Sequence, residues 1–125
     1  MFLSAGDVYI VDFGEPFGVE QGGIRPAIIV SNASCCMFSD FIYVAPITSQ
    51  QSKSNIPEHY TLTNTDYTFL NSPNNIVLGE QCRPIDKSRL KYKIGEIQLD
   101  TLYQITKRIK INFIWAGNKK WNIMI

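Results

Sequence analysis

The chain has 125 residues, of which 45% are hydrophobic and 18% are charged, a composition typical of a globular protein rather than a disordered one. A chain of this length can form one domain, residues 1–125, that buries roughly two thirds of its unfolded surface. No apolar run approaches the ~20 residues of a membrane span, and the first residues lack the basic region of a signal peptide. The three cysteines form neither a disulfide framework nor a zinc motif, so we expect a cytoplasmic protein in which they are small buried residues.

The net charge of +1 hides an asymmetry along the chain. Residues 1–80 carry two basic and eight acidic side chains, whereas residues 81–125 carry ten basic and three acidic side chains. A basic second half can attract a polyanion or an acidic, disordered protein. It can equally be a solvated helix face followed by a polar tail.

Two apolar strands joined by a polar loop open the chain. Residues 8–13 form the first strand, in which we expect Tyr9 to face away from the core. Residues 27–30 are an uninterrupted apolar run, typical of a strand buried on both faces. Pro26 biases Arg25 toward extended geometry, so a guanidinium is held at the mouth of the second strand, where it can bind an anion.

Further short strands and a terminal helix follow. We expect strands at residues 40–48, 59–62, 75–78 and 81–85, with a short helical piece after Asn32. Pro46 predicts a bulge or an edge position near the end of its strand. From Leu99 to Phe113, apolar residues recur at three- and four-residue steps, which predicts an amphipathic helix of about four turns that ends at Gly117-Asn118. The sequence therefore predicts a mainly β fold of the α+β class, a small β-barrel of five to seven short strands with a C-terminal amphipathic helix.

Few residues in this chain can carry catalytic chemistry. His59 is the only histidine, which excludes a two-histidine ribonuclease mechanism, and a histidine without an evident acid partner is typically structural. The carboxylates are too scattered for a paired-acid site or a metal site, and no helix follows Gly22-Gly23 as a nucleotide-binding motif requires, so we expect no metal and no cofactor. The remaining candidates are Glu20, Gln21, Arg25, Thr48 and Glu80-Gln81-Cys82-Arg83. On the pattern alone, they are either polar groups at a barrel rim or a functional site.

Four motifs stand in order along the chain: GDVYIVDFG, EQGGIRPAIIVSN, VAPITS and EQCRPIDKSRL, followed by the amphipathic helix. Together they resemble the MazF/PemK family of toxins from type II toxin–antitoxin modules. The resemblance runs from about Gly6 to Ile114, and EQGGIRP is its most specific part. It implies a homodimeric, metal-independent endoribonuclease with an SH3-like barrel. Such a toxin cleaves single-stranded messenger RNA at a short sequence until a labile antitoxin blocks the groove.

The resemblance also implies which residues form the site. By position, Arg25 and Thr48 are the catalytic pair, and Glu20 and Gln81 lie beside them in the RNA groove. The other residues to which we assign substrate binding are Gln21, Gly22, Arg83 and Phe17. Pro84 interrupts the strand that contains Arg83, so we expect Arg83 to be displaced from the groove.

The chemistry of RNA is compatible with these roles. RNA supplies its own nucleophile, the 2′-OH, and its attack on the adjacent phosphorus leaves a 2′,3′-cyclic phosphate and a 5′-OH end. An arginine keeps its proton in proteins, so we expect Arg25 to clamp the phosphate while water or Glu20 transfers the proton.

Two alternative functions stay open. Gyrase-poisoning toxins resemble the same barrel and act by binding through a C-terminal tail, a role that residues 121–125 can fill here. The GG-x-R-P string followed by Thr48 argues against this reading. The second alternative is a catalytically silent barrel that binds only RNA or an antitoxin. For the endoribonuclease, the expected partner protein is an antitoxin whose acidic C-terminal segment is disordered when free and folds across the groove between two basic second halves of a dimer.

Overall fold

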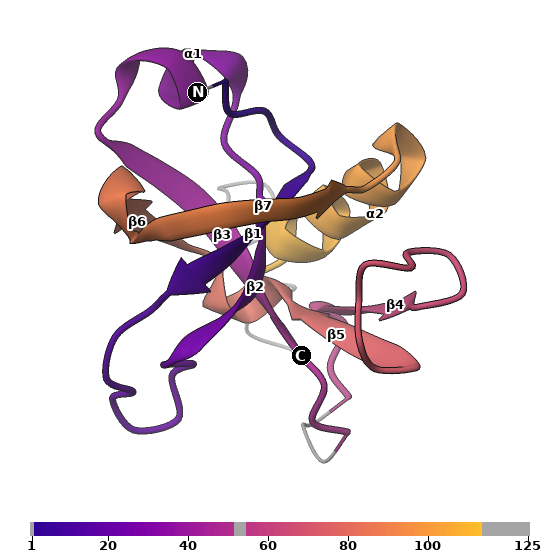
Figure 1. The fold of residues 1–125 in the computed structure, drawn as a ribbon. Coiled ribbons are helices and arrows are strands. Elements are labelled where there is room, and N and C mark those ends of the chain that lie inside the picture. The colour runs from indigo at the N-terminus through magenta and orange to yellow at the C-terminus, as the bar shows by residue number, and fades with distance from the viewer. Residues whose placement is uncertain (1, 52–54, 114–125) are drawn as a thin grey trace.

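The computed structural model describes residues 2–51 and 55–113, which form seven strands and two α-helices (Figure 1). In chain order the elements are β1 (Asp7–Asp12), β2 (Ile24–Ile29), α1 (Ala33–Phe38), β3 (Phe41–Thr48), β4 (His59–Thr63), β5 (Asn74–Leu78), the 3₁₀ turn η1 (Gly79–Gln81), β6 (Arg83–Asp86), the 3₁₀ turn η2 (Lys87–Arg89), β7 (Leu90–Glu96) and α2 (Leu99–Lys110). The predicted mainly β fold with five to seven short strands and a C-terminal helix is confirmed.

The seven strands belong to one antiparallel sheet, in which six follow the order β4-β5-β3-β2-β1-β7 and β6 pairs with β3 beside this path. One edge of β3 pairs with β2, and its other edge pairs first with β6 and then with β5. Strands β4 and β7 end the order, so the curved sheet is not closed into a complete barrel across the residues described. This arrangement places β2 and β3, which carry the predicted catalytic residues, at the centre of the sheet.

Of the two predicted positions for Pro46, a bulge or an edge strand, the edge strand is wrong, because Pro46 is buried within β3 opposite Ala27. The carbonyl of Tyr43 accepts a hydrogen bond from Val30 N on the β2 side, so strand alternation directs the nitrogen of Pro46 to the opposite edge. On that edge, β3 changes partner from β6 to β5 between Val44 and Ile47. A residue without an N–H group is tolerated at this change of partner because no ladder bond is lost there.

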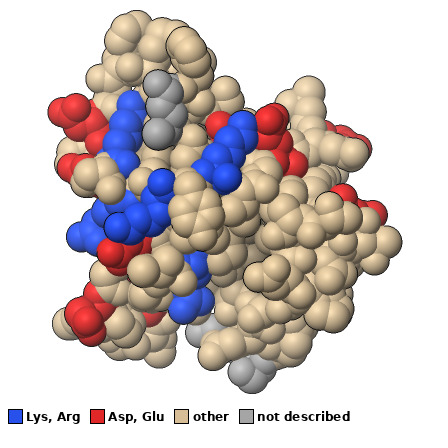
Figure 2. All heavy atoms as spheres, in the orientation of Figure 1, with Lys and Arg blue, Asp and Glu red and all other residues tan. Residues whose placement is uncertain are grey.

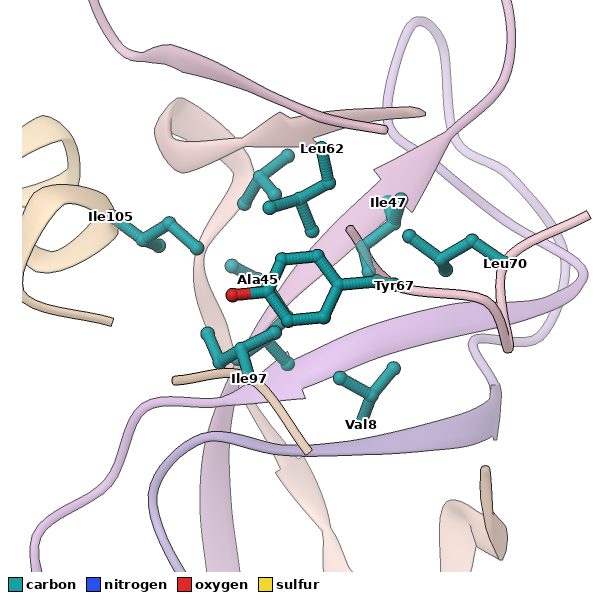
Figure 3. Packing of buried hydrophobic residues seen from close by; sticks show 10 residues of the cluster. Val8, Ala45, Ile47, Leu62, Tyr67, Leu70, Ile97 and Ile105 are labelled. Carbon is teal, nitrogen blue, oxygen red and sulfur yellow. The ribbon is translucent and has the colours of Figure 1, made fainter. Parts of the chain in front are cut away.

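Both faces of the central strands are buried. One face packs against α2 and the β4–β5 segment, with the ring of Tyr67 in the middle of a cluster that also contains Val8, Ala45 and Ile105 (Figure 3). The other face forms a second cluster that contains Ile29 and Val44. The run predicted to be buried on both sides is confirmed for residues 27–29, with Ile28 in the first cluster and Ala27 and Ile29 in the second, whereas Val30 is half-buried. The expectation for Tyr9 is wrong, because Tyr9 is buried in the second cluster.

Strand β7 was absent from the predicted strands. It forms one end of the sheet order, and residues 90–94 (LKYKI) do alternate apolar and basic side chains, a strand signal that the prediction overlooked. Lys91, Tyr92 and Lys93 are all exposed. Lysines on an edge strand oppose edge-to-edge pairing with other chains. The strand predicted at residues 81–85 begins later, at Arg83, because Gly79–Gln81 form η1.

The two helices agree only partly with the sequence pattern. Helix α1 begins where predicted, and Asn32 Oδ1 caps it by accepting a hydrogen bond from Cys35 N at 3.0 Å. Helix α2 ends at Lys110, earlier than predicted, and Gly117-Asn118 lie outside the described residues. Leu99 is exposed although the pattern placed it on the buried face. No helix among the residues described is long and apolar enough to cross a membrane.

Candidate active site

Arg25 and Thr48 lie at adjacent ends of the neighbouring strands β2 and β3. Ala27 is paired with Pro46, so continuing this antiparallel register by two residues places Arg25 opposite Thr48 on one face of the sheet. Both residues contribute to the lining of a cavity of about 370 Å³, which Phe69 and Ile94 also line. The structure thus brings together the two residues to which catalysis was assigned from sequence.

The side chain of Arg25 is half-buried and anchored at one point. Its Nε donates a hydrogen bond of 2.8 Å to the carbonyl oxygen of Gly22. Across residues 2–51 and 55–113, no ion pair involves Arg25. The anchored Nε fixes the guanidinium plane, while the two Nη groups keep the fork that binds two oxygens of a phosphate.

The hydroxyl group of Thr48 is buried and partly oriented. Its Oγ1 accepts a hydrogen bond of 3.2 Å from the backbone nitrogen of Gln50. A hydroxyl group both accepts and donates, so this bond leaves the proton of Thr48 available for an anionic ligand. Arg25 and Thr48 together therefore present cationic and neutral donors at one place.

Backbone hydrogen bonds close the loop between β1 and β2 at its base, and Gly22 packs directly against the backbone of Pro16 farther along it. Phe13 N donates to the carbonyl of Gly23 at 2.9 Å, and Gly23 N donates to the carbonyl of Gly14 at 2.7 Å. A Cβ atom on residue 22 would lie 2.5 Å from the nitrogen of Pro16, so only glycine fits there without moving the loop. This close approach fixes the carbonyl that holds Arg25.

Three predicted substrate-binding residues, Gln21, Gln81 and Arg83, contact this loop or belong to it. The side-chain oxygen of Gln81 accepts a hydrogen bond of 2.7 Å from Gln21 N. Arg83 donates from Nη2 to the carbonyl of Phe13 at 3.2 Å, and its guanidinium lies 4.7 Å from the centre of the Phe13 ring. Pro84 lies inside β6 and is paired with Tyr43, so the prediction that it interrupts this strand is wrong.

Phe17 and Glu20 occupy the outer part of the loop. Both residues are exposed, and Glu20 N donates a hydrogen bond of 3.0 Å to the carbonyl of Phe17. Neither residue lines the cavity beside Arg25. In fact none of the six predicted substrate-binding residues lines this cavity. The aromatic ring of Phe17 is accessible to a ligand.

Sequence reasoning missed a polar pair close to this region. His59 Nε2 and Glu80 Oε2 are 2.9 Å apart, so the expectation that His59 lacks an acid partner is wrong. No spacing in the sequence could have shown this contact, because the pairing of β4 with β5 brings residue 59 next to the turn that follows residue 78. Phe69 and Ile94 of the cavity wall were also missed, the latter because β7 itself was missed.

Burial keeps the thiols of Cys82 and Cys36 from acting as nucleophiles. Burial raises the pKa of the Cys82 thiol to about 11, so this group stays protonated at neutral pH. Burial also raises the pKa of Cys36. Only Cys36 is fully buried, whereas Cys35 and Cys82 are half-buried, so the prediction of three buried cysteines is wrong for these two.

Basic side chains gather over β7 and the preceding turn, on the face shown in Figure 2. They include Lys87, Arg89, Lys91 and Lys93. Lys93 is neutralised, since its Nζ lies 3.2 Å from an oxygen of Asp7 and 3.0 Å from an oxygen of Glu96. Most of this band therefore remains a positive surface that suits a polyanion or an acidic peptide.

Comparison with known proteins identifies the family. Residues 4–113 match the model of a family described as the PemK-like, MazF-like toxin of type II toxin-antitoxin system. The chain is 35% identical over 110 residues to the endoribonuclease MazF of Staphylococcus saprophyticus, an alignment that covers 88% of this chain and 90% of that protein. Its fold is similar to a crystal structure of MazF from Deinococcus radiodurans, with a TM-score of 0.74, 26% identity and coverage of 90% of this chain and 96% of that chain. It is also similar to a crystal structure of MazE-MazF from the same organism, with a TM-score of 0.69, 26% identity and the same coverages of 90% and 96%. The chain therefore belongs to the PemK-like, MazF-like toxins of type II toxin–antitoxin systems.

Proposed function

We propose that this toxin is a metal-independent endoribonuclease that cleaves single-stranded messenger RNA at a short sequence and so inhibits translation. One observation carries the proposal: an anchored guanidinium and a buried hydroxyl group lie at adjacent strand ends beside one cavity. The relative from Staphylococcus saprophyticus is named an endoribonuclease, which supports the same class of reaction. The name of this relative gives no support to the two alternatives, a gyrase poison or a silent binding protein.

The reaction uses the nucleophile that RNA itself carries. The 2′-oxygen forms a bond to the adjacent phosphorus, the bond from phosphorus to the 5′-oxygen breaks, and the products are a 2′,3′-cyclic phosphate and a 5′-OH end. DNA lacks the 2′-OH and is spared. Negative charge grows on the two non-bridging oxygens, where the Nη groups of Arg25 bind, and Thr48 donates its proton in a hydrogen bond to the same phosphate.

In this proposal water takes the proton of the 2′-OH, and water also gives a proton to the leaving 5′-oxygen, which becomes the 5′-OH end. An arginine keeps its own proton in proteins, so Arg25 acts as a phosphate clamp. Glu20 lies on the outer part of the loop and lines no part of the cavity. Cys82 stays protonated at neutral pH because burial raises its pKa to about 11.

The β1–β2 loop forms one wall of the RNA-binding groove. Phe17 offers an exposed ring on which an unstacked base can stack, and the exposed Glu20 offers a carboxylate to base edges. Gln21 and Gly22 are buried and shape the wall from within through their bonds to Gln81 and Arg25. Gln81 and Arg83 support this wall from η1 and β6 through their hydrogen bonds to Gln21 N and the Phe13 carbonyl.

The partners follow from the same surfaces. One matched Deinococcus radiodurans structure is of MazE-MazF, which supports an antitoxin partner for this toxin. We assign to that antitoxin an acidic C-terminal segment that folds across the basic band and competes with RNA. We also assign a homodimer, in which two copies share one groove. We assign the protein to the cytoplasm, where its substrate, messenger RNA, is present. Simultaneous tight binding of RNA and the antitoxin segment would contradict a shared site.

Incubation of the pure protein with a long RNA in the presence of EDTA tests the proposal. We expect cleavage at recurrent short sequences and cyclic-phosphate 3′ ends. Intact RNA together with gyrase-dependent DNA breaks would instead establish the poison. Intact RNA without DNA breaks would leave only binding.

Removal of the Thr48 hydroxyl is expected to slow RNA cleavage by roughly 10- to 150-fold, because hydrogen bonds to charged groups contribute about 1.5–3 kcal/mol. Thr48→Val removes the hydroxyl and keeps the shape, whereas Thr48→Ser keeps the hydroxyl and should retain most of the rate. The measurement is the single-turnover cleavage rate of one RNA oligonucleotide. Thr61→Val, on an exposed position of β4, is the matched control and should cleave at the wild-type rate.

A further inference from the structure

We propose that His59 and Glu80 are positioning residues that fix the orientation of Arg25 through η1 and the β1–β2 loop. This inference rests on the proposed function and concerns the arrangement behind the catalytic pair. Neither residue lines the cavity beside Arg25. Each acts on the guanidinium through other residues.

The contact between the two side chains is short and shielded. His59 Nε2 lies 2.9 Å from Glu80 Oε2, and the His59 side chain is 7% exposed against 31% for Glu80. A carboxylate accepts hydrogen bonds and cannot donate them, so Nε2 is the donor. A hydrogen bond to a charged group in such a sheltered place constrains both partners more firmly than an exposed ion pair.

Glu80 belongs to η1, a three-residue turn that other elements also hold. Gly79 N donates to the carbonyl of Glu58 at 3.2 Å, and Asn112 Nδ2 donates to the carbonyl of Gly79 at 2.8 Å. A Cβ atom on residue 79 would lie 2.5 Å from the Glu58 carbonyl oxygen, so η1 is in direct backbone contact with the residue that precedes His59 and β4. Short 3₁₀ turns have weak internal bonding, so their geometry depends on such external contacts.

The position of η1 is passed on to the β1–β2 loop through Gln81. The residue after Glu80 is Gln81, whose side-chain oxygen accepts a 2.7 Å hydrogen bond from Gln21 N. The residue after Gln21 is Gly22, whose carbonyl accepts the 2.8 Å hydrogen bond from Arg25 Nε. A continuous series of contacts thus runs from His59 through Glu80, Gln81 and the loop to the guanidinium.

Loss of the contact between His59 and Glu80 is expected to slow the chemical step and to leave the affinity for RNA nearly unchanged. A catalytic group displaced by about 1 Å can lose up to roughly 100-fold in rate. Arg25 binds the phosphate oxygens most strongly in the transition state, so its misalignment lowers kcat more than it changes KM.

Glu80→Ala tests the inference in the full-length protein, with a fluorescent RNA oligonucleotide as substrate. We expect kcat to fall about 10-fold with KM within about twofold of wild type, while Glu80→Gln, which still accepts from His59, stays within about twofold in both. Glu96→Ala removes a carboxylate of the same charge from an exposed pair on β7 and should leave kcat unchanged. The ¹⁵N resonance of Arg25 Nε should shift in Glu80→Ala and stay in place in Glu96→Ala.

The double variant Glu80→Ala/Gln81→Ala shows whether the two residues act on Arg25 through one series of contacts or affect the cleavage rate independently. If the series of contacts acts as a unit, the double variant should be little slower than Gln81→Ala alone. Losses that multiply, or a Glu80→Ala protein that cleaves at the wild-type rate, would overturn the inference. His59→Ala removes the same contact from β4 and replaces Glu80→Ala if that variant does not fold. Failure of the wild-type protein to cleave RNA would overturn the proposed function instead.

Discussion

Substitution of Arg25 by alanine is expected to lower the rate of RNA cleavage by about 10²–10³-fold while the fold persists. Loss of one preorganised donor to a developing oxyanion typically removes about 2.7–4 kcal/mol of transition-state stabilisation. Arg25 is such a donor, because its Nε is already held by the Gly22 carbonyl and no carboxylate among the residues described neutralises it. The guanidinium therefore needs little reorganisation when charge grows on the phosphate.

Arg25→Lys distinguishes a positive charge from a positioned fork. A lysine carries the charge but has no counterpart of the anchored Nε and cannot bind two phosphate oxygens in parallel. We expect it to recover only a small part of the lost rate. Full recovery would show that charge alone is sufficient and would contradict the clamp geometry.

Single-turnover kinetics with saturating enzyme measure the chemical step directly. Arg108→Ala is the matched control, because Arg108 lies on the exposed face of α2 and donates to the carbonyl of Pro57. It should cleave at the wild-type rate. Circular dichroism and thermal unfolding check that Arg25→Ala retains the fold. A folded Arg25→Ala protein with wild-type activity would refute the assignment.

The sequence predicted the parts of this site that depend on local pattern. Pro26 and the buried run after it place Arg25 at a strand mouth, and Thr48 at a strand end follows from the third strand. That these two ends are neighbours follows from the β2–β3 register, which the alternation of a single sequence does not specify between distant strands. The resemblance to a family supplied this pairing before the structure did.

Long-range polar contacts were beyond the reach of the sequence. Residues 59 and 80, and residues 21 and 81, meet only because β4 lies beside β5 and η1 lies beside the loop. Strand β7 is a different case, because Leu90, Tyr92 and Ile94 alternate with lysines in a local pattern that the sequence does show and that the prediction overlooked. Local patterns thus predicted most of the strands, whereas the contacts behind Arg25 required the tertiary structure.

Helix α2 shows why a helical period alone overestimates burial. Leu99 and Ile105 both belong to the apolar positions of the sequence pattern, yet Leu99 is 81% exposed and Ile105 is 0% exposed. Leu99 is the first residue of the helix, where the chain has only just left β7. Ile105 lies in the middle of the helix, against Tyr67, Ala45 and the rest of the first core cluster (Figure 3).

Ile105→Ala is therefore expected to lower the free energy of unfolding by about 2–5 kcal/mol, a large part of the roughly 5–15 kcal/mol that stabilises a typical domain. The loss combines the transfer energy of the deleted carbons with the cavity that they leave, because the surrounding strands cannot fully collapse around it. Leu99→Ala deletes an apolar side chain of the same size from an exposed position, so it should change the free energy by about 0.5 kcal/mol or less. Urea unfolding of both variants at one protein concentration measures this difference. Equal losses at the two positions would contradict the burial of α2 described above, since a helix that packs through Ile105 cannot depend on Leu99 to the same degree.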